Sequence, residues 1–334
     1  MTETTQQESL VQVKGIRKLF PVRSQIFSRS PAGGKFVHAV DGVTVELRKG
    51  EVLSLVGESG CGKTTLARLI LRLLSPTEGT ILFEGQDLFA ASRSEMHKLR
   101  LQMQAVFQDP YASLDPKKTI FQVVSEPLVV NHLSKAGTNI AQRVNESLTA
   151  VGLTPPAMYL GKFPYELSGG QRQRVAIARA IVINPRLIVA DEPVSMLDVS
   201  IRAEILALLL DLKRKFDLTY VFITHDLAVA RHVSDRMAVM YLGKIVEIGP
   251  ADDVCSKPAH PYTEALLSAL PAADPRMRGR GVKLKGEVPN AVEIPSGCRF
   301  RPRCPLAIDR CLVEPELVRV GPDHYAACWL AKEA

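Results

Sequence analysis

The sequence contains no hydrophobic run long enough to cross a membrane. A spanning helix needs about 20 consecutive apolar residues, whereas the longest apolar run, residues 205–210, is short and bounded by charged residues. The first eight residues have neither the basic flank nor the apolar centre of a secretory signal. We therefore expect an ordinary helix at 205–210 and a chain that remains in the cytoplasm.

Low-complexity tracts and a strong charge imbalance are also missing. The 334 residues are 46% hydrophobic, which favours a globular chain with two domains, or one large domain with an appendage, over a disordered chain. The net charge of +7 is mild. A basic cluster at 276–285 is interpreted as a solvated face, ahead of a surface for an anionic membrane and then for nucleic acid.

Closely spaced cysteine pairs are absent, although the chain has six cysteines. The reducing compartment expected for the chain excludes structural disulfides. Four cysteines crowd the proline-rich, strand-poor tail with the spacing C-x5-C-x6-C-x16-C: Cys298, Cys304, Cys311 and Cys328. Without the C-x2–4-C pairs of zinc ribbons, zinc fits less well than an iron–sulfur cluster, which needs four thiolate ligands. Free buried thiols are the remaining alternative.

What the sequence does contain is a phosphate loop. The motif G-x-x-x-x-G-K-T is formed by Gly57, Glu58, Ser59, Gly60, Cys61, Gly62, Lys63 and Thr64. An apolar run at 52–56 precedes the motif and helical periodicity at 65–71 follows it, which is the strand-to-helix context that the motif requires. Its glycines let the backbone curl around a polyphosphate, while Lys63 reaches the outer phosphates and the Thr64 hydroxyl binds Mg²⁺. With these flanks, a glycine-rich turn that binds nothing is the weaker interpretation.

Apolar periodicity outlines the rest of the fold. Strands are predicted at 11–16, 39–47, 80–83, 103–108, 187–190 and 220–224, and helices at 94–101 and 200–216. Residues 119–151 are helical without strands, which indicates a helical subdomain inserted into the sheet domain, and 21–36 is interpreted as a surface loop. A hairpin of 236–241 and 244–248 closes the domain, and the composition changes near residue 250. Buried strands that alternate with helices predict a doubly wound α/β core.

Three further motifs carry polar groups suited to phosphate chemistry. Asp191 and Glu192 end an apolar strand, where Asp191 can complete a Mg²⁺ shell through water and Glu192 can polarise an attacking water. His225 ends a second apolar strand, and residues 167–171 open a helix with a Ser-Gly-Gly cap that can bind an anion. Each alone has an ordinary structural explanation. Their joint order and spacing favour one nucleotide site.

Together these motifs resemble the ATP-binding subunits of ABC transporters over residues 11–249. The resemblance implies an α/β fold: a P-loop ABC ATPase core with an antiparallel β subdomain and an inserted helical subdomain, followed by a small Cys-rich C-terminal extension. It implies an ATPase domain at 1–250, with the helical subdomain at about 112–180, and an extension at 251–334. ATP and Mg²⁺ are the implied cofactors.

The resemblance also assigns roles to individual positions. Glu192, His225 and Gln108 become catalytic residues, and Asp198 lies in the D-loop at 195–198. Thr64, Gln108 and Asp191 are the implied Mg²⁺ site. The implied ATP contacts are Phe20, Gly57, Glu58, Ser59, Gly60, Cys61, Gly62, Lys63, Thr64, Thr65, Ser168, Gly169, Gly170 and Gln171. Phe20 would stack on adenine, with a place in the core as its alternative.

Residues 57–63, 108–116 and 260–267 resemble more narrowly the F-type ATPase subunit of dipeptide and oligopeptide importers. Asp115 stands where that branch usually has Asn, and Met196 where Ala is more usual. Neither change removes a catalytic group, but they leave the solute open, with nickel or another small solute as the alternative. Some members of the branch hold a [4Fe–4S] cluster, which favours that assignment for the four cysteines over zinc.

Partners follow from the same resemblance. The nucleotide is sandwiched between the loop of one ATPase and the signature of another, so Ser168 and Gly170 would serve the site of a D-type partner in a heterodimer. Two transmembrane permease subunits and an extracytoplasmic solute-binding protein would complete an importer, with this subunit peripheral on the cytoplasmic face of the cell membrane. A soluble ABC ATPase acting on nucleic acid or ribosomes is the rival, but such proteins usually carry two cassettes or a long coiled coil. No nucleic acid partner is therefore expected, and a module that only binds ATP would not need Glu192 and His225.

Overall fold

The computed structural model describes residues 8–22, 35–133, 139–269 and 289–332. Most of the predicted loop at 21–36 and the basic cluster at 276–285 lie outside these residues. The chain divides into two compact units, Met1–Ala90 with Ile223–Ala334, and Ala91–Phe222. Within the described ranges, no helix has both the length and the apolar character needed to cross a bilayer.

The first unit contains an antiparallel sheet in the order β2-β1-β4-β5. Its strands are β1 (Ser9–Pro21), β2 (Phe36–Arg48), β4 (Glu78–Phe83) and β5 (Gln86–Asp87). Val43, Val45 and Leu47 are buried on alternate positions of β2, as a strand with one solvated face requires. The strand predictions at 11–16, 39–47 and 80–83 are confirmed, although β1 and β2 extend to 13 residues each through a bulged register.

A second set of strands in this unit follows the order β11-β12-β10-β9-β3. β3 (Val52–Val56) is buried along its whole length and runs parallel to β9 (Arg236–Tyr241). β9 forms the predicted hairpin with β10 (Lys244–Pro250). Leu242 and Gly243 both have positive φ at the turn, as a tight two-residue hairpin requires. The parallel, fully buried β3 agrees with the predicted α/β core.

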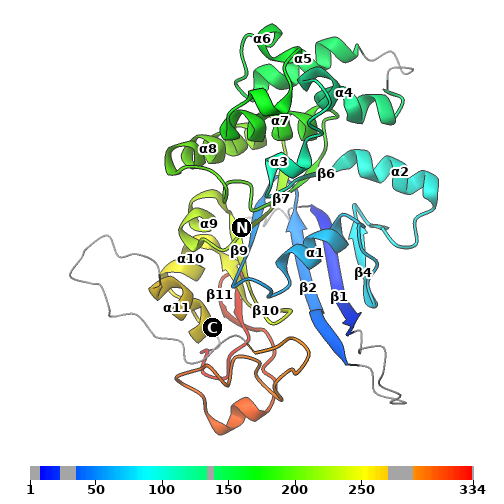
Figure 1. The fold of residues 1–334 in the computed structure, drawn as a ribbon. Coiled ribbons are helices and arrows are strands. Elements are labelled where there is room, and N and C mark those ends of the chain that lie inside the picture. The colour runs from blue at the N-terminus through cyan, green and yellow to red at the C-terminus, as the bar shows by residue number, and fades with distance from the viewer. Residues whose placement is uncertain (1–7, 23–34, 134–138, 270–288, 333–334) are drawn as a thin grey trace, which may run out of the picture. The chain divides into compact units, whose positions relative to one another are not determined.

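The tail contributes two strands that the sequence did not reveal. β12 (His324–Ala326) pairs antiparallel with β10, and β11 (Val318–Gly321) pairs antiparallel with β12 (Figure 1). Strands this short carry too little alternation to be recognised from the sequence, and the described tail remains poor in strands. The helices of this unit are α1 (Lys63–Ile70), α9 (Leu227–Val233), α10 (Ala251–Ser256), α11 (Pro261–Ser268) and the 3-10 turn η4 (Asp309–Leu312).

One hydrophobic cluster joins the tail to the strand that leads into the phosphate loop. Val56 at the end of β3 belongs to the same cluster as Tyr241 of β9, Tyr262 of α11 and Phe300. The Tyr262 and Phe300 ring centroids lie 4.7 Å and 5.3 Å from that of Tyr241. Burial of large aromatic side chains contributes strongly to stability. The tail and the loop-bearing strand therefore form one core.

The second unit contains β6 (Met103–Val106) and β7 (Leu187–Asp191), which run parallel, and most of β8 (Thr219–Thr224). The predicted strand at 103–108 ends early, because Asp109 caps α3 (Pro110–Ser113) and turns the chain away. The other helices are α2 (Arg93–Gln102), α4 (Ile120–Val130), α5 (Ile140–Ala150), α6 (Ala157–Leu160), the 3-10 turn η2 (Pro164–Glu166), α7 (Gly169–Ile181) and α8 (Val199–Phe216).

The predicted helical region at 119–151 is confirmed as α4 and α5, which pack against each other and against α7. Val123, Leu148 and Val175 are buried, one on each of these helices. Pro127 lies inside α4 instead of ending it. Figure 1 shows these helices in green as a layer made only of helices.

Candidate active site

The phosphate loop connects β3 to α1 as its motif predicts. Gly57, Gly60 and Gly62 have φ of 147°, 78° and 108°, values that residues with a Cβ rarely adopt. A Cβ on Gly57 would lie 2.3 Å from the Met240 carbonyl oxygen, and one on Gly62 would lie 2.2 Å from the Ala39 carbonyl oxygen. The loop therefore packs so closely on neighbouring backbone that only glycine fits at these two positions.

Lys63 begins α1 and folds back over the loop. Its side chain is buried, and Nζ donates to the carbonyl oxygens of Gly57 at 2.7 Å and Glu58 at 3.0 Å. The first turn of α1, residues 63–66, contains no acidic side chain, so the positive helix N-terminus stays available to an anion. Thr64 is half-buried in that turn. An ammonium group, a helix start and a hydroxyl thus meet in one short segment, which is suited to bind a polyphosphate with its Mg²⁺.

Cys61 of the loop is a buried thiol. Its Sγ lies 3.6 Å from Lys63 Nζ, and burial raises the pKa of the thiol above its usual value. A buried thiol with a raised pKa is a poor nucleophile. Cys61 therefore serves to pack the loop.

Two other predicted site residues lie in the same unit. His225 follows the end of β8 and is exposed, and Asp226 beside it caps α9. Phe20 is half-buried near the end of β1, with Lys18 Nζ 5.1 Å from its ring centroid. The Phe20 ring is thus partly accessible, as an adenine platform must be, and the stacking role stays a prediction.

In the second unit, Gln108 and Glu192 are brought together. β6 and β7 run parallel with Val106 opposite Ala190, so the residues two positions beyond this pair leave the sheet at the same edge. Gln108 Nε2 donates to Glu192 Oε2 at 3.1 Å. Glu192 has a φ of 46°, an unusual value for a residue with a Cβ, and such strain is concentrated at functional sites. Asp191, half-buried, ends β7 immediately before it.

The predicted signature forms the start of α7. Ser168 caps the helix, with its Oγ accepting from the Gln171 backbone N–H at 3.3 Å while Gln171 Oε1 accepts from the Ser168 N–H at 3.0 Å. This reciprocal capping box fixes an exposed serine at a helix start whose first turn has no acidic residue. A Cβ on Gly170 would lie 2.8 Å from Ile201 Cγ2, so this position also favours glycine.

The D-loop lies beside the signature in this unit. A Cβ on Gly169 would lie 3.6 Å from Leu197 Cδ2, and Asp198 is exposed at the N-cap of α8. Met196, which departs from the usual Ala, is 56% exposed. The substitution therefore disturbs no packing within the chain.

The four clustered cysteines line one small cavity in the first unit, together with Phe300 and Trp329. All six cysteines of the chain are free thiols, and burial raises the pKa of Cys298, Cys304 and Cys328. Among the described residues, no three His, Cys, Asp or Glu side chains lie where they could jointly hold a metal ion. The cysteines therefore share a cavity, but their arrangement does not fit the predicted metal centre as it stands.

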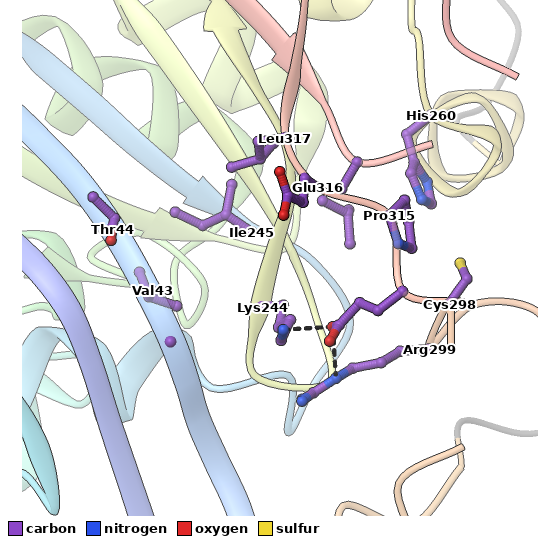
Figure 2. A pocket seen from close by; sticks show the side chains of 14 residues that line it. Val43, Thr44, Lys244, Ile245, His260, Cys298, Arg299, Pro315, Glu316 and Leu317 are labelled. Carbon is purple, nitrogen blue, oxygen red and sulfur yellow. Dashed lines mark ion pairs between the residues drawn. The ribbon is translucent and has the colours of Figure 1, made fainter. Parts of the chain in front are cut away.

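A separate cavity of about 500 Å³ lies between β2, the β9–β10 hairpin and the tail (Figure 2). Lys244 and Arg299 both pair with Glu314, and Arg299 also pairs with Asp41 of β2. The phosphate-loop residues do not line this cavity. The cationic side chains labelled in Figure 2 are therefore already matched by carboxylates of the same unit.

Sequence reasoning missed two residues that contact the loop, Tyr262 and Arg303. Tyr262 Oη accepts from the Glu58 backbone N–H at 2.9 Å, and Arg303 pairs with the Glu58 carboxylate. Tyr262 stands in the 260–267 segment that supported the narrower resemblance, which was the available signal. Arg303 has no such signal, although it directly precedes Cys304.

Residues 40–195 match the family model described as ABC transporter, and residues 246–311 match the model described as Oligopeptide/dipeptide transporter, C-terminal region. The chain is 46% identical over 328 residues to the oligopeptide transport ATP-binding protein AppF of Bacillus subtilis (strain 168), covering 97% of this chain and 98% of that protein. It is also 46% identical over 315 residues to the putative oligopeptide transport ATP-binding protein YkfD of the same organism, covering 93% and 95%. The similarity thus includes both the region matched by the first family model and the region matched by the second.

Solved structures agree with the fold. CbiO1 from Clostridium perfringens, part of the ABC transporter complex cbiONQ, has a TM-score of 0.63 at 29% identity and covers 75% of this chain and 92% of its own. The ATP-binding cassette MJ0796, in a dimeric post-hydrolysis state bound to ADP and Pi, has a TM-score of 0.61 at 29% identity, with 72% and 98% covered.

Proposed function

Because this chain belongs to the ATP-binding proteins of ABC transporters, in the oligopeptide transport group, we propose that it hydrolyses ATP to power the import of di- or oligopeptides. The observation that carries this function is the 46% identity to an oligopeptide transport ATP-binding protein over 97% of the chain. The match at 246–311 to the C-terminal region of oligopeptide and dipeptide transporters supports the peptide class of solute over nickel. The predicted ABC ATPase fold and the ATPase activity are both confirmed by these relationships.

Different residues bind ATP and catalyse its hydrolysis. Lys63 and the N-terminus of α1 bind the outer phosphates, and the glycines keep the loop backbone close to them. Glu192 accepts a proton from the attacking water, and Gln108, hydrogen-bonded to Glu192, orients that carboxylate. Mg²⁺, held by Thr64, Gln108 and Asp191, would neutralise phosphate charge.

The signature at the start of α7 is assigned to a second ATPase. Ser168 and Gly170 lie at a helix N-terminus whose first turn has no acidic side chain. This positive end suits the γ-phosphate of a nucleotide held by the partner. Binding of ATP would draw the two ATPases together, and hydrolysis would remove the bridging phosphate and release them. We assign the partner to the D-type subunit of a heterodimer, joined to two membrane permease subunits and an extracytoplasmic binding protein, with this chain on the cytoplasmic face of the membrane.

The proposed function is tested on the complex purified with its permease subunits and reconstituted in vesicles. ATP hydrolysis should rise several-fold when the external binding protein carries a di- or oligopeptide, because the solute-loaded protein favours the closed ATPase pair. Stimulation by nickel in place of peptide would contradict the solute class. Hydrolysis that responds to no loaded binding protein would contradict transport.

We also propose that the four tail cysteines hold a [4Fe–4S] cluster. The proposal is supported by the cavity that the four side chains line together. Cluster binding would require the thiols to lose their protons, whereas burial raises the pKa of Cys298 and of Cys304 and so favours the protonated form.

Anaerobic purification tests the cluster directly. We expect a brown protein with about four irons and four sulfides per chain, and loss of both in Cys304→Ser. The matched control is Cys255→Ser, a cysteine that does not line the cavity, which should retain the colour. A colourless wild-type protein, or one that contains zinc or no metal, overturns the assignment.

A further inference from the structure

Glu58, which follows Gly57 in the phosphate loop, is held by hydrogen bonds from or to three side chains. The Glu58 backbone N–H donates to Tyr262 Oη at 2.9 Å, and the Glu58 carbonyl accepts from Lys63 Nζ at 3.0 Å. The Glu58 carboxylate accepts two hydrogen bonds from Arg303, at 2.7 Å and 3.1 Å. Two of these three partners come from the tail. The conformation of the loop is therefore set partly by residues far from the motif.

Arg303 is itself held firmly in place. Its N–H donates to the Phe300 carbonyl at 2.9 Å, which closes a turn, and Phe300 is 1% exposed between Tyr241 and Tyr262. The guanidinium side chain is 7% exposed, whereas the Glu58 side chain is 27% exposed. A bidentate, largely buried pair of this kind is geometrically specific. The pairing also raises the pKa of Arg303, so the guanidinium keeps its charge.

The charge of this pair bears on nucleotide binding. Glu58 is a carboxylate within the loop that surrounds the phosphates, and an unpaired negative charge there would repel ATP. Arg303 cancels that charge from the side of the tail. We propose that Arg303 is a positioning residue for ATP binding, which neutralises Glu58 and, with Tyr262, holds the phosphate loop ready for the nucleotide. This inference rests on the proposed function in one respect, that the loop binds ATP.

Removing the negative charge of Glu58 together with Arg303 distinguishes charge neutralisation from a merely structural role of Arg303. In Arg303→Gln the Glu58 carboxylate loses its partner, and we expect the Kd for MgATP to rise about tenfold. In Glu58→Gln with Arg303→Gln the repulsion is gone, so the Kd should return to within about threefold of wild type. If Arg303 only anchored the tail, removing both partners would weaken binding at least as much as removing one.

Added salt gives a second readout. Because salt screens the repulsion between Glu58 and the phosphates, the ratio of the Arg303→Gln Kd to the wild-type Kd should fall as ionic strength rises. Arg303→Lys, which keeps the charge but not the two-pronged geometry, should bind ATP more tightly than Arg303→Gln. This variant also keeps the test decisive if Arg303→Gln folds poorly.

The matched control is Arg299→Gln. Arg299 is another buried arginine of the tail, but it pairs with Asp41 and the Leu242 carbonyl instead of the loop. This variant should lower the melting temperature while leaving the Kd within about twofold of wild type.

The Kd values are measured by calorimetric titration of the full-length chain, beginning with wild type. A wild-type chain that binds no ATP overturns the proposed function itself. A wild-type chain that binds ATP, with an unchanged Kd in Arg303→Gln or an unrescued double variant, overturns only the role of Arg303.

Discussion

Replacement of Glu192 by glutamine should stop ATP turnover while leaving ATP binding intact. Glutamine has the shape of glutamate and can still accept the hydrogen bond from Gln108 Nε2, which is 3.1 Å long in the wild-type chain. It cannot accept a proton from water. General base catalysis contributes about 10²- to 10⁴-fold, so the rate of phosphate release should fall by that factor.

The variant should also trap the closed ATPase pair, because ATP binds and is not consumed. We expect the protein, mixed with its partner ATPase, to elute as a stable dimer with ATP and as separate subunits with ADP. Glu204→Gln is a matched control, since Glu204 is an exposed glutamate of the same unit that pairs with Arg174. It should hydrolyse ATP at the wild-type rate. Wild-type turnover in Glu192→Gln would assign the proton transfer to another group, with His225 the first to examine.

The parts of this site that the sequence predicted are those encoded by local pattern. The phosphate loop is contiguous, so its glycines, Lys63 and the flanking strand and helix are all visible in one segment. Gln108 was assigned to the site by the family resemblance, and its contact with Glu192 is explained by the parallel pairing of β6 and β7, which aligns the carboxyl ends of the two strands. The helix start at Ser168 was visible as a Ser-Gly-Gly cap, and the structure adds its capping box with Gln171.

The parts that the sequence did not predict depend on contacts between distant segments. Tyr262 and Glu58 are separated by 204 residues, and Arg303 and Glu58 by 245. No periodicity or spacing connects residues so far apart. The tail strands β11 and β12 were missed for a similar reason, since they are recognisable only by pairing: β12 pairs with β10, and β11 pairs with β12. The four cysteines are clustered in the sequence and line one cavity in the structure, but their spacing along the chain does not fix how the thiols are placed for a metal.

Replacement of Gly57 by alanine should weaken ATP binding severely. The added Cβ would lie 2.3 Å from the Met240 carbonyl oxygen and 2.9 Å from Cys61 Sγ. The Met240 carbonyl belongs to the backbone of β9, which is hydrogen-bonded in a buried parallel pair with β3, so it cannot withdraw without breaking the sheet. The loop must move instead, and the atoms that accept Lys63 Nζ move with it. We expect the Kd for MgATP to rise at least a hundredfold, about 2.7 kcal/mol.

The matched control is Gly60→Ala in the same loop. Gly60 also has a positive φ, 78°, but a Cβ there would meet nothing within 4 Å. Alanine at this position costs about 1–2 kcal/mol of backbone strain without displacing neighbouring atoms, so ATP binding should weaken by no more than about thirtyfold. Both variants are measured by calorimetric titration, with circular dichroism to confirm that each is folded. If a folded Gly57→Ala protein binds ATP as tightly as Gly60→Ala, the close approach to β9 is not what requires glycine at position 57. Backbone strain alone would then explain the requirement.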